Sequence, residues 1–234
     1  MLTAHTLHRP IYGAAQLDPD TAVLTVGVHA DATPARWRLA SRGRAQHTTI
    51  IGDSGSGISS LLRSILHGAA IAGVAAQAVD LDGTAAAARQ ALAEQHDLAR
   101  TRTTDPDGDR GLRLLIIDDL HELTKDRGFV DRLTRFAKLA GRAGIAMVAG
   151  TGDVSLSGFG GRYCDATLTR QALAQQLVLL RTGDGPMLRA GLRALGVDVD
   201  NYSSVPAKAG DGSTTAGIGY LPRRSTVPFR AWLP

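Results

Sequence analysis

"TIIGDSGSGISSLLRSIL", residues 49–66, decides the fold of this chain. A short β-branched run, a glycine-rich turn and apolar residues at helical spacing predict a strand, a loop and a helix in that order. The spacing G-x-x-x-x-G-K-[ST] of a phosphate-binding P-loop is met by Gly52, Gly57 and Ser59. Position 58, where that pattern has lysine, is Ile58. The stretch therefore predicts a phosphate-binding loop without its usual charge.

The backbone of a P-loop provides most of its phosphate contacts. Consecutive N–H groups point into a concave nest at the start of a helix, and both the nest and the helix dipole favour anions. Glycine is needed where φ is positive or where the backbone approaches a phosphate closely. The alternative is a glycine–serine turn that arose by chance. We expect the nucleotide to contact a continuous run of the loop and the first helical turn: Gly52, Asp53, Ser54, Gly55, Ser56, Gly57, Ile58, Ser59 and Ser60.

A second motif lies about 60 residues further on, in "LRLLIIDDLHEL", residues 112–123. An apolar run that ends in acids predicts a buried parallel strand with carboxylates at its carboxyl end. In a Walker B strand the first acid orders the Mg²⁺ shell and the next residue, usually Glu, polarises the attacking water. Asp118 and Asp119 are therefore the candidate catalytic residues, and Asp118 and Ser59 the candidate Mg²⁺ ligands. Glu122 is a substitute for the missing Glu only if its segment folds back. The alternative is a polar strand end that caps the next helix.

The rest of the chain alternates strands and helices. Strands are predicted at 76–83, 112–117 and 145–151, and helices at 84–101 and 129–144. This alternation, with apolar strands, predicts an α/β fold of the RecA-like P-loop NTPase type, a mostly parallel sheet with helices on both faces.

The 234 residues suit one such domain with room for a small appendage. Two strands, at 22–28 and 36–40, are predicted before the P-loop, and a hairpin is one way to join them. We divide the chain into an N-terminal lead-in with short β-strands, residues 1–44, and the P-loop domain, residues 45–234.

The formal net charge is +4, and the 26 basic residues include only three lysines, Lys125, Lys138 and Lys208. Arginine suits phosphate recognition, but a base-composition bias of the genome is the alternative explanation. The single cysteine, Cys164, forms no intrachain disulfide, which fits a reducing cytoplasm. The apolar run at 68–79 is too short to span a bilayer. We expect a cytoplasmic protein that reaches a membrane only through a partner.

Five stretches of the chain together resemble one protein family. The P-loop stretch, "AVDLDG", "LLIIDDLHEL", "LAGRAGIAMVAGTGDVS" and "GIGYLPRRSTVPFRAWLP" are similar to the motor domain of FtsK/SpoIIIE-type DNA translocases, especially the conjugal DNA-transfer proteins of actinobacterial plasmids. The resemblance covers roughly residues 45–230. It implies ATP and Mg²⁺ as cofactors, double-stranded DNA as a partner, and either a homo-oligomer or a complex with a partner translocase.

Three departures from the family pattern weaken the expected chemistry. Ile58 replaces the lysine, Asp119 stands where the family has Glu, and "AGTGD" at 149–153 replaces a segment that commonly reads Ala-Thr-Gln-Arg-Pro. A lysine about 4 Å from phosphate charge contributes about 4 kcal/mol at an effective dielectric of 20, roughly a thousandfold in affinity. Substitute cations are an arginine from a neighbouring subunit or three residues of this chain, each of which has a solvated surface charge as its alternative role: Arg110, Lys125 and Arg142.

These observations leave three hypotheses. The preferred one is a pseudo-ATPase, a regulatory subunit that binds ATP at most weakly and acts in DNA translocation or conjugal transfer. The second is an active ATP-dependent DNA translocase that receives its missing cation in trans. The third is a DNA-binding module with a dead nucleotide pocket. Two further groups of residues have a structural alternative to a functional role. His47 and His121 are then packing or surface histidines. The pairs are then solvated charges rather than DNA contacts: Arg36/Arg38, Arg100/Arg102 and Arg223/Arg224.

Overall fold

The computed structural model describes residues 11–79, 85–105, 111–163, 165–183, 185–222 and 224–233. Several residues of the sequence analysis lie outside these ranges. They are residues 1–10, the strand end and helix start at 80–84, Arg110, Cys164 and Arg223.

Five parallel strands form one half of the sheet, in the order β11-β7-β10-β9-β8. The strand that precedes the P-loop, β7, lies between β10 and β11, so the loop emerges in the middle of the parallel half. All seven residues of β10 are buried, as expected for a strand covered on both faces. The bounds are β7 (Thr48–Ile51), β8 (Ala75–Val79), β9 (Arg113–Ile117), β10 (Ile145–Thr151) and β11 (Gln176–Leu180).

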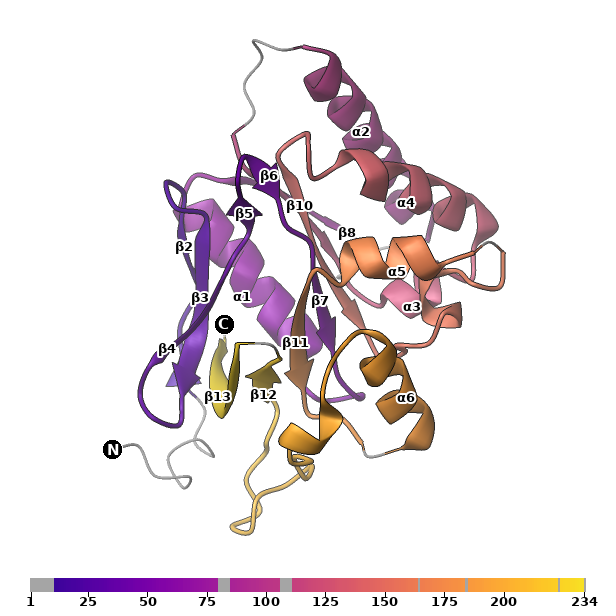
Figure 1. Ribbon diagram of the computed structural model, residues 1–234. Coiled ribbons are helices and arrows are strands. Elements are labelled where there is room, and N and C mark those ends of the chain that lie inside the picture. The colour runs from indigo at the N-terminus through magenta and orange to yellow at the C-terminus, as the bar shows by residue number, and fades with distance from the viewer. Residues whose placement is uncertain are drawn as a thin grey trace.

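Helices cover both faces of these strands (Figure 1). Leu114 and Ile116 of β9 belong to the core cluster that contains α1, whereas Leu115 and Ile117 belong to the cluster that contains α2 and α4. Alternate side chains of one strand therefore enter opposite cores. The helices are α1 (Ile58–Ile71), α2 (Ala85–Thr104), α3 (Leu120–Leu123), α4 (Arg127–Leu139), α5 (Thr167–Leu173) and α6 (Pro186–Ala194), with 3₁₀ turns η2 (Ser157–Phe159) and η3 (Val199–Asn201). No helix of the described part is long and apolar enough to cross a membrane.

The other half of the sheet is antiparallel and continues from β11. Its order is β11-β12-β13-β3-β2, with β4 beside β3 and β1 parallel to β13. The predicted RecA-like α/β fold is confirmed, but the sheet is mixed rather than mostly parallel, because the strands beyond β11 pair mainly in the antiparallel sense. The remaining bounds are β1 (Ile11–Tyr12), β2 (Gln16–Asp18), β3 (Val23–His29), β4 (Pro34–Arg38), β12 (Ile218–Leu221) and β13 (Ser225–Leu233), with a separate hairpin of β5 (Ala40–Ser41) and β6 (Arg44–Ala45).

The predicted lead-in packs directly on the P-loop helix. The N–H of Ala15 donates to Ser64 Oγ at 2.8 Å, and a Cβ on Gly68 would lie 2.0 Å from the Ala15 carbonyl oxygen. The helix therefore needs glycine at this position to approach residue 15 so closely. The strands of residues 11–44 share a sheet and a core with the P-loop domain.

His47 ties β7 to its neighbours at the opposite end from the P-loop. Its side chain is buried, and Nδ1 accepts a hydrogen bond from the Met147 N–H at 3.0 Å. Its backbone carbonyl accepts from the Gln176 N–H at 3.0 Å. Burial lowers the pKa of His47 to about 4, against a weaker opposing effect of a hydrogen bond with the Ala137 backbone. His47 is thus a neutral packing histidine, as the sequence analysis preferred.

This pKa predicts that the protein loses stability in mild acid. The folded chain holds His47 neutral, while the unfolded chain takes up a proton near pH 6.5, so stability falls as the pH drops from 6.5 towards 4. At 1.36 kcal/mol per pKa unit the loss amounts to about 3 kcal/mol. Urea unfolding between pH 4 and 7 measures it. His47→Gln should flatten this dependence, while the exposed His67→Gln should leave it intact; an equal slope in all three proteins would contradict the assignment.

Candidate functional site

Backbone hydrogen bonds from three other segments hold the loop between β7 and α1. The Gly52 N–H donates to the Thr151 carbonyl at 3.2 Å, and the Asp53 N–H donates to the Arg181 carbonyl at 2.9 Å. The Ser56 carbonyl accepts from the Gly217 N–H at 2.7 Å, and the Gly217 carbonyl accepts from Ala231 at 2.8 Å. The ends of β10 and β11 and the segment before β12 therefore fix the path of the loop.

The loop forms a nest of unused amides. Gly55 and Gly57 have φ values of 69° and 98°, and a Cβ on Gly57 would lie 2.8 Å from the Gly217 nitrogen. Glycine is thus required at position 57 both by the backbone conformation and by the close approach of residue 217. Within the described chain, no acceptor is found for the N–H groups of Ser54, Gly55, Gly57, Ile58, Ser59 and Ser60. These donors lie in the loop and the first turn of α1. Free N–H groups at the start of a helix are the arrangement that binds phosphate oxygens.

The predicted site residues gather around one open cavity of about 640 Å³. All of the predicted loop residues, 52–60, line it, and both predicted aspartates of the Walker B strand lie on its other side. The remaining lining residues are His121, Glu122, Gly152 and Ala216.

Asp118 lies at the carboxyl end of β9 and is only 4% exposed. Its Oδ1 accepts a hydrogen bond from the Asp119 N–H at 3.0 Å, and its own N–H donates to the Val79 carbonyl at 3.1 Å. A Cβ on Gly150 would lie 3.2 Å from this Oδ1, so glycine in β10 leaves space for the carboxylate. Asp118 and Ser59 suit Mg²⁺, which is usually held by one or two carboxylates, waters and the phosphates themselves. In the ranges described, no group of three or more His, Cys, Asp or Glu side chains is placed to hold a metal.

Asp119 has the left-handed backbone conformation, with φ 45° and ψ 44°. It is exposed, and it turns the chain from β9 into the short helix α3. A non-glycine residue in this region is strained by about 1–2 kcal/mol, somewhat less for Asp, and such residues gather at functional sites. After this strained turn the chain folds back, and Glu122 lines the cavity. Folding back was the condition under which the sequence analysis considered Glu122 a substitute for the missing Glu.

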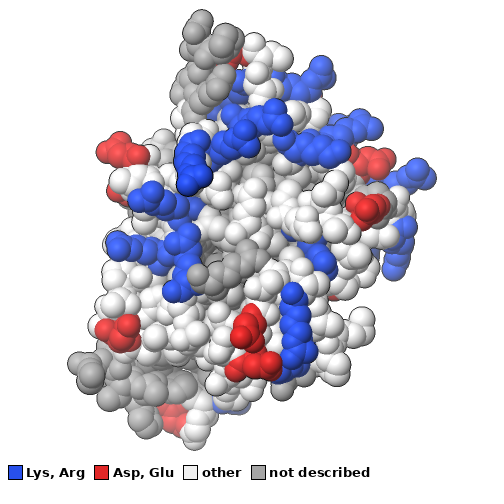
Figure 2. All heavy atoms as spheres, viewed as in Figure 1, with Lys and Arg blue, Asp and Glu red and all other residues white. Residues whose placement is uncertain are grey.

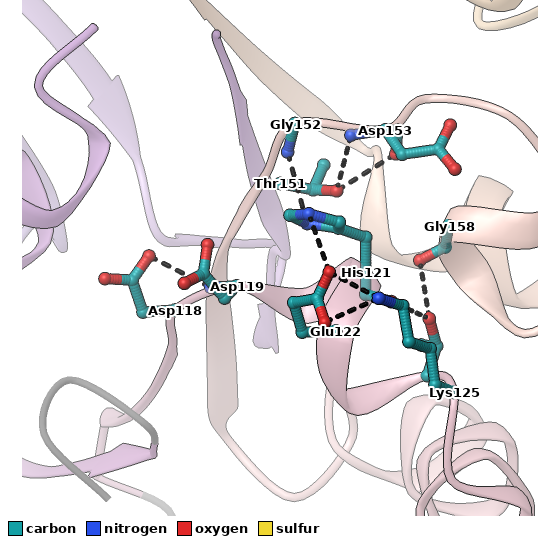
Figure 3. A network of polar contacts seen from close by, with 10 residues as sticks. Asp118, Asp119, His121, Glu122, Lys125, Thr151, Gly152, Asp153 and Gly158 are labelled. Atoms are coloured by element: carbon teal, nitrogen blue, oxygen red, sulfur yellow. Dashed lines mark hydrogen bonds and ion pairs between the residues drawn. The ribbon is translucent and has the colours of Figure 1, made fainter. Parts of the chain in front are cut away.

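Figure 3 shows the polar network beside these aspartates. His121 Nδ1 accepts from the Gly152 N–H at 3.4 Å, and its Nε2 lies 3.6 Å from Glu122 Oε1. Lys125 Nζ donates to Glu122 at 2.6 and 2.7 Å and lowers the pKa of that carboxyl group, so Glu122 is ionised. His121 thus connects the Walker B side to Gly152 in the 149–153 segment. The sequence analysis preferred a packing or surface role for this histidine, and it gave no signal for the contact with Gly152.

The side chain of Ile58 faces the sheet. Its Cγ2 lies 2.3 Å from where a Cβ on Gly150 would stand, and it packs against the core cluster beneath α1. Ile58 therefore contributes its backbone N–H to the nest and its side chain to the core. An apolar side chain offers phosphate no hydrogen bond, so the charge of the missing lysine is not replaced at this position.

Neither of the two described cations that the sequence suggested, Lys125 and Arg142, lines the cavity. Lys125 is paired with Glu122, and Arg142 lies just before β10, at the end of the sheet opposite the cavity. Arg110 is outside the described residues. The arginine that does reach the loop is Arg181, whose guanidinium donates to the Ser54 carbonyl. The sequence analysis missed it, although its position directly after the apolar run "QLVLL" was an available signal.

Two solved structures share this fold. The cytoplasmic domain of the type VII secretion ATPase EccC from Thermomonospora curvata superposes with a TM-score of 0.62 at 15% identity, over 96% of this chain. ATPases 2 and 3 of EssC from Geobacillus thermodenitrificans superpose with a TM-score of 0.62 at 11% identity, over 97% of this chain. The chain spans 29% and 47% of the length of those proteins. No protein-family model and no curated protein matches the sequence. At these identities the likeness shows that the chain shares their fold.

The conformation of Asp119 gives a test by substitution. Asp119→Gly should be more stable than Asp119→Ala by about 1 kcal/mol, with the wild type between them, because only glycine adopts φ near +45° without strain. Denaturant unfolding of the three proteins measures the order. Equal stability of the Ala and Gly variants would show that the left-handed turn is not a constraint.

Proposed function

We propose that this chain is a pseudo-ATPase, a P-loop domain that binds Mg²⁺–ATP weakly and turns it over slowly or not at all. The observation that carries the proposal is the formed nest of unused backbone amides opposite Asp118, in a cavity whose lysine position is occupied by Ile58. Binding by the amides and the metal is retained in this arrangement, while the usual charge is missing. By its resemblance to FtsK/SpoIIIE-type translocases, we place its role in DNA translocation or conjugal transfer, as a regulatory subunit that docks on a partner translocase or on a second copy.

The charges around the cavity support a metal-dependent mode of binding. Four lining residues are acids, Asp53, Asp118, Asp119 and Glu122, and none of the described lining residues is Lys or Arg. A free nucleotide anion would be repelled by these carboxylates, while its Mg²⁺ complex carries less charge. Ser59 and Asp118 would hold the metal, which would neutralise the phosphates when bound.

The features expected for hydrolysis are weak. Asp119 is one methylene shorter than the Glu that usually polarises the water, and Glu122 is engaged by Lys125. The 149–153 segment presents Gly152 to His121 rather than a glutamine side chain. These departures favour the pseudo-ATPase over an active motor that receives its cation in trans.

The likeness to secretion ATPases is compatible with an accessory domain. The chain covers 47% of a protein that contains two ATPase units, so it corresponds in length to about one such unit. Domains of this kind occur there in series, which supports a role beside another ATPase domain rather than alone.

The positive charge that is missing at position 58 can be restored by substitution. Ile58→Lys should raise the affinity for Mg²⁺–ATP by up to about a thousandfold, because the nest is already formed and has no cationic side chain in direct contact with the phosphates. Calorimetric titration of ATP with Mg²⁺ or EDTA measures it, with Ile58→Met as the uncharged control. Asp118→Asn should remove the dependence on Mg²⁺. An affinity that does not rise with lysine would mean that the nest does not bind phosphate.

Phosphate release in the presence of DNA separates the pseudo-ATPase from the active translocase. We expect no stimulated release from the wild type. DNA-dependent turnover that Asp118→Ala abolishes would support the motor instead.

A second candidate function, binding of DNA phosphates, is favoured by a band of basic side chains. Figure 2 shows the band across the end of the molecule where β4, the β5–β6 hairpin and α4 lie. The Ala45 N–H donates to the Gly141 carbonyl at 2.9 Å, which joins the hairpin to the turn after α4. These side chains are exposed, and within the described residues none forms an ion pair with an acid: Arg36, Arg38, Arg42, Arg44, Arg132, Arg135, Lys138 and Arg142.

Salt dependence tests this second function. Each phosphate contact makes the slope of log K against log salt more negative by about 0.9. The double variant Arg42→Gln/Arg44→Gln should therefore make the slope for double-stranded DNA less steep by about 2. Fluorescence anisotropy with a labelled duplex measures the slope. Arg89→Gln, which removes an arginine already paired with Asp126, is the matched control. Binding that does not change with salt would exclude the band as a phosphate contact.

A further inference from the structure

We propose that Arg181 supplies, from within the same chain, the positive charge that Ile58 does not. This inference rests on the proposed function, because it assigns a residue to the phosphate site of a bound nucleotide. Arg181 follows β11 directly, at the carboxyl end of the parallel strands, where the P-loop also lies. It acts as a positioning residue, through the peptide group between Ser54 and Gly55.

Arg181 holds the loop by two separate contacts. Its backbone carbonyl accepts from the Asp53 N–H at 2.9 Å, and its guanidinium donates to the Ser54 carbonyl. Nη2 would lie 3.4 Å from a Cβ on Gly55, so the guanidinium also packs against the loop beside this glycine. The backbone contact is independent of the side chain. A substitution at 181 therefore removes the charge and leaves the loop anchored.

The guanidinium is one peptide group away from the nest. In a trans peptide the C=O and the N–H point in opposite directions within the peptide plane, so the Gly55 N–H points away from Arg181 at the opposite edge of the peptide. That N–H has no acceptor in the described chain. A charged donor on the Ser54 carbonyl polarises the peptide, which strengthens the Gly55 N–H as a donor to phosphate.

The charge of Arg181 is available for this role. No carboxylate of the described residues forms an ion pair with it. By contrast, Arg189 and Arg193 of α6 are both paired with Asp200. Arg181 is thus a cation that contacts the loop and is neutralised by none of the surrounding described residues.

A comparison of charge variants tests the inference. Arg181→Gln should weaken Mg²⁺–ATP binding about tenfold, or about 1.4 kcal/mol, weaken ADP binding less and leave adenosine binding unchanged. Arg181→Lys should keep the affinity within about threefold, and Arg193→Gln, on neighbouring α6, is the control. Calorimetric titration measures each affinity, and a thermal melt of each variant confirms that it is folded.

The decisive measurement repeats Arg181→Gln in the Ile58→Lys background. If Arg181 stands in for the missing lysine, its loss should cost less than about threefold once Lys is present at 58. An equal tenfold loss in both backgrounds would overturn the inference, because a purely structural role of Arg181 would not depend on residue 58. Wild-type binding of Mg²⁺–ATP that Arg181→Gln leaves intact would overturn it too, while the proposed function would stand. A wild type that does not bind Mg²⁺–ATP would overturn the proposed function and the inference together.

Discussion

Backbone hydrogen bonds to the ends of β10 and β11 and to residue 217 hold the loop between β7 and α1 in place. The order of strands in the sheet brings these partners together. Because β7 lies between β10 and β11, carbonyls at both neighbouring strand ends are in reach of Gly52 and Asp53. The antiparallel half supplies the third contact through Gly217. Only the N–H groups of Gly52 and Asp53 donate in these bonds to other segments, so most of the other N–H groups of the loop have no acceptor in the described chain.

A single glycine couples the two motifs of the site. Gly150 in β10 leaves room for Asp118 on one strand and for the side chain of Ile58 on the first turn of α1. A larger residue there would collide with both. Once an isoleucine occupies position 58 and turns towards this space, the core gains an apolar contact and the cavity loses its cation. The electrostatic character of the cavity is therefore linked to the packing beneath α1.

The sequence analysis predicted β7, β8, β9 and β10 of the parallel half because their signals are local, but it predicted no strand at β11. Strands with two buried faces read as continuous apolar runs, and the predicted strand at 145–151 coincides with β10. The glycine spacing and the paired acids located the loop and Asp118. The antiparallel half was harder to predict, because β12 has only four residues and β13 pairs on its other side with β3, near the start of the chain. The approach of Glu122 depends on the backbone of Asp119, which composition does not encode. Arg181 is one arginine among many; its place after "QLVLL" is a weak signal, and its contact with Ser54 is seen only in the structure.

The hydrogen bonds from Ser56 to Gly217 and from Gly217 to Ala231 also bear on how the site comes into being. The residues that complete the support of the loop are synthesised long after the loop itself. While the chain is still emerging from the ribosome, the strand–loop–helix unit can form locally, but its third anchor is absent until residues 217–231 arrive. Contacts of such sequence separation form slowly. During synthesis, therefore, the nascent chain carries this loop without its third anchor until the antiparallel half closes on it.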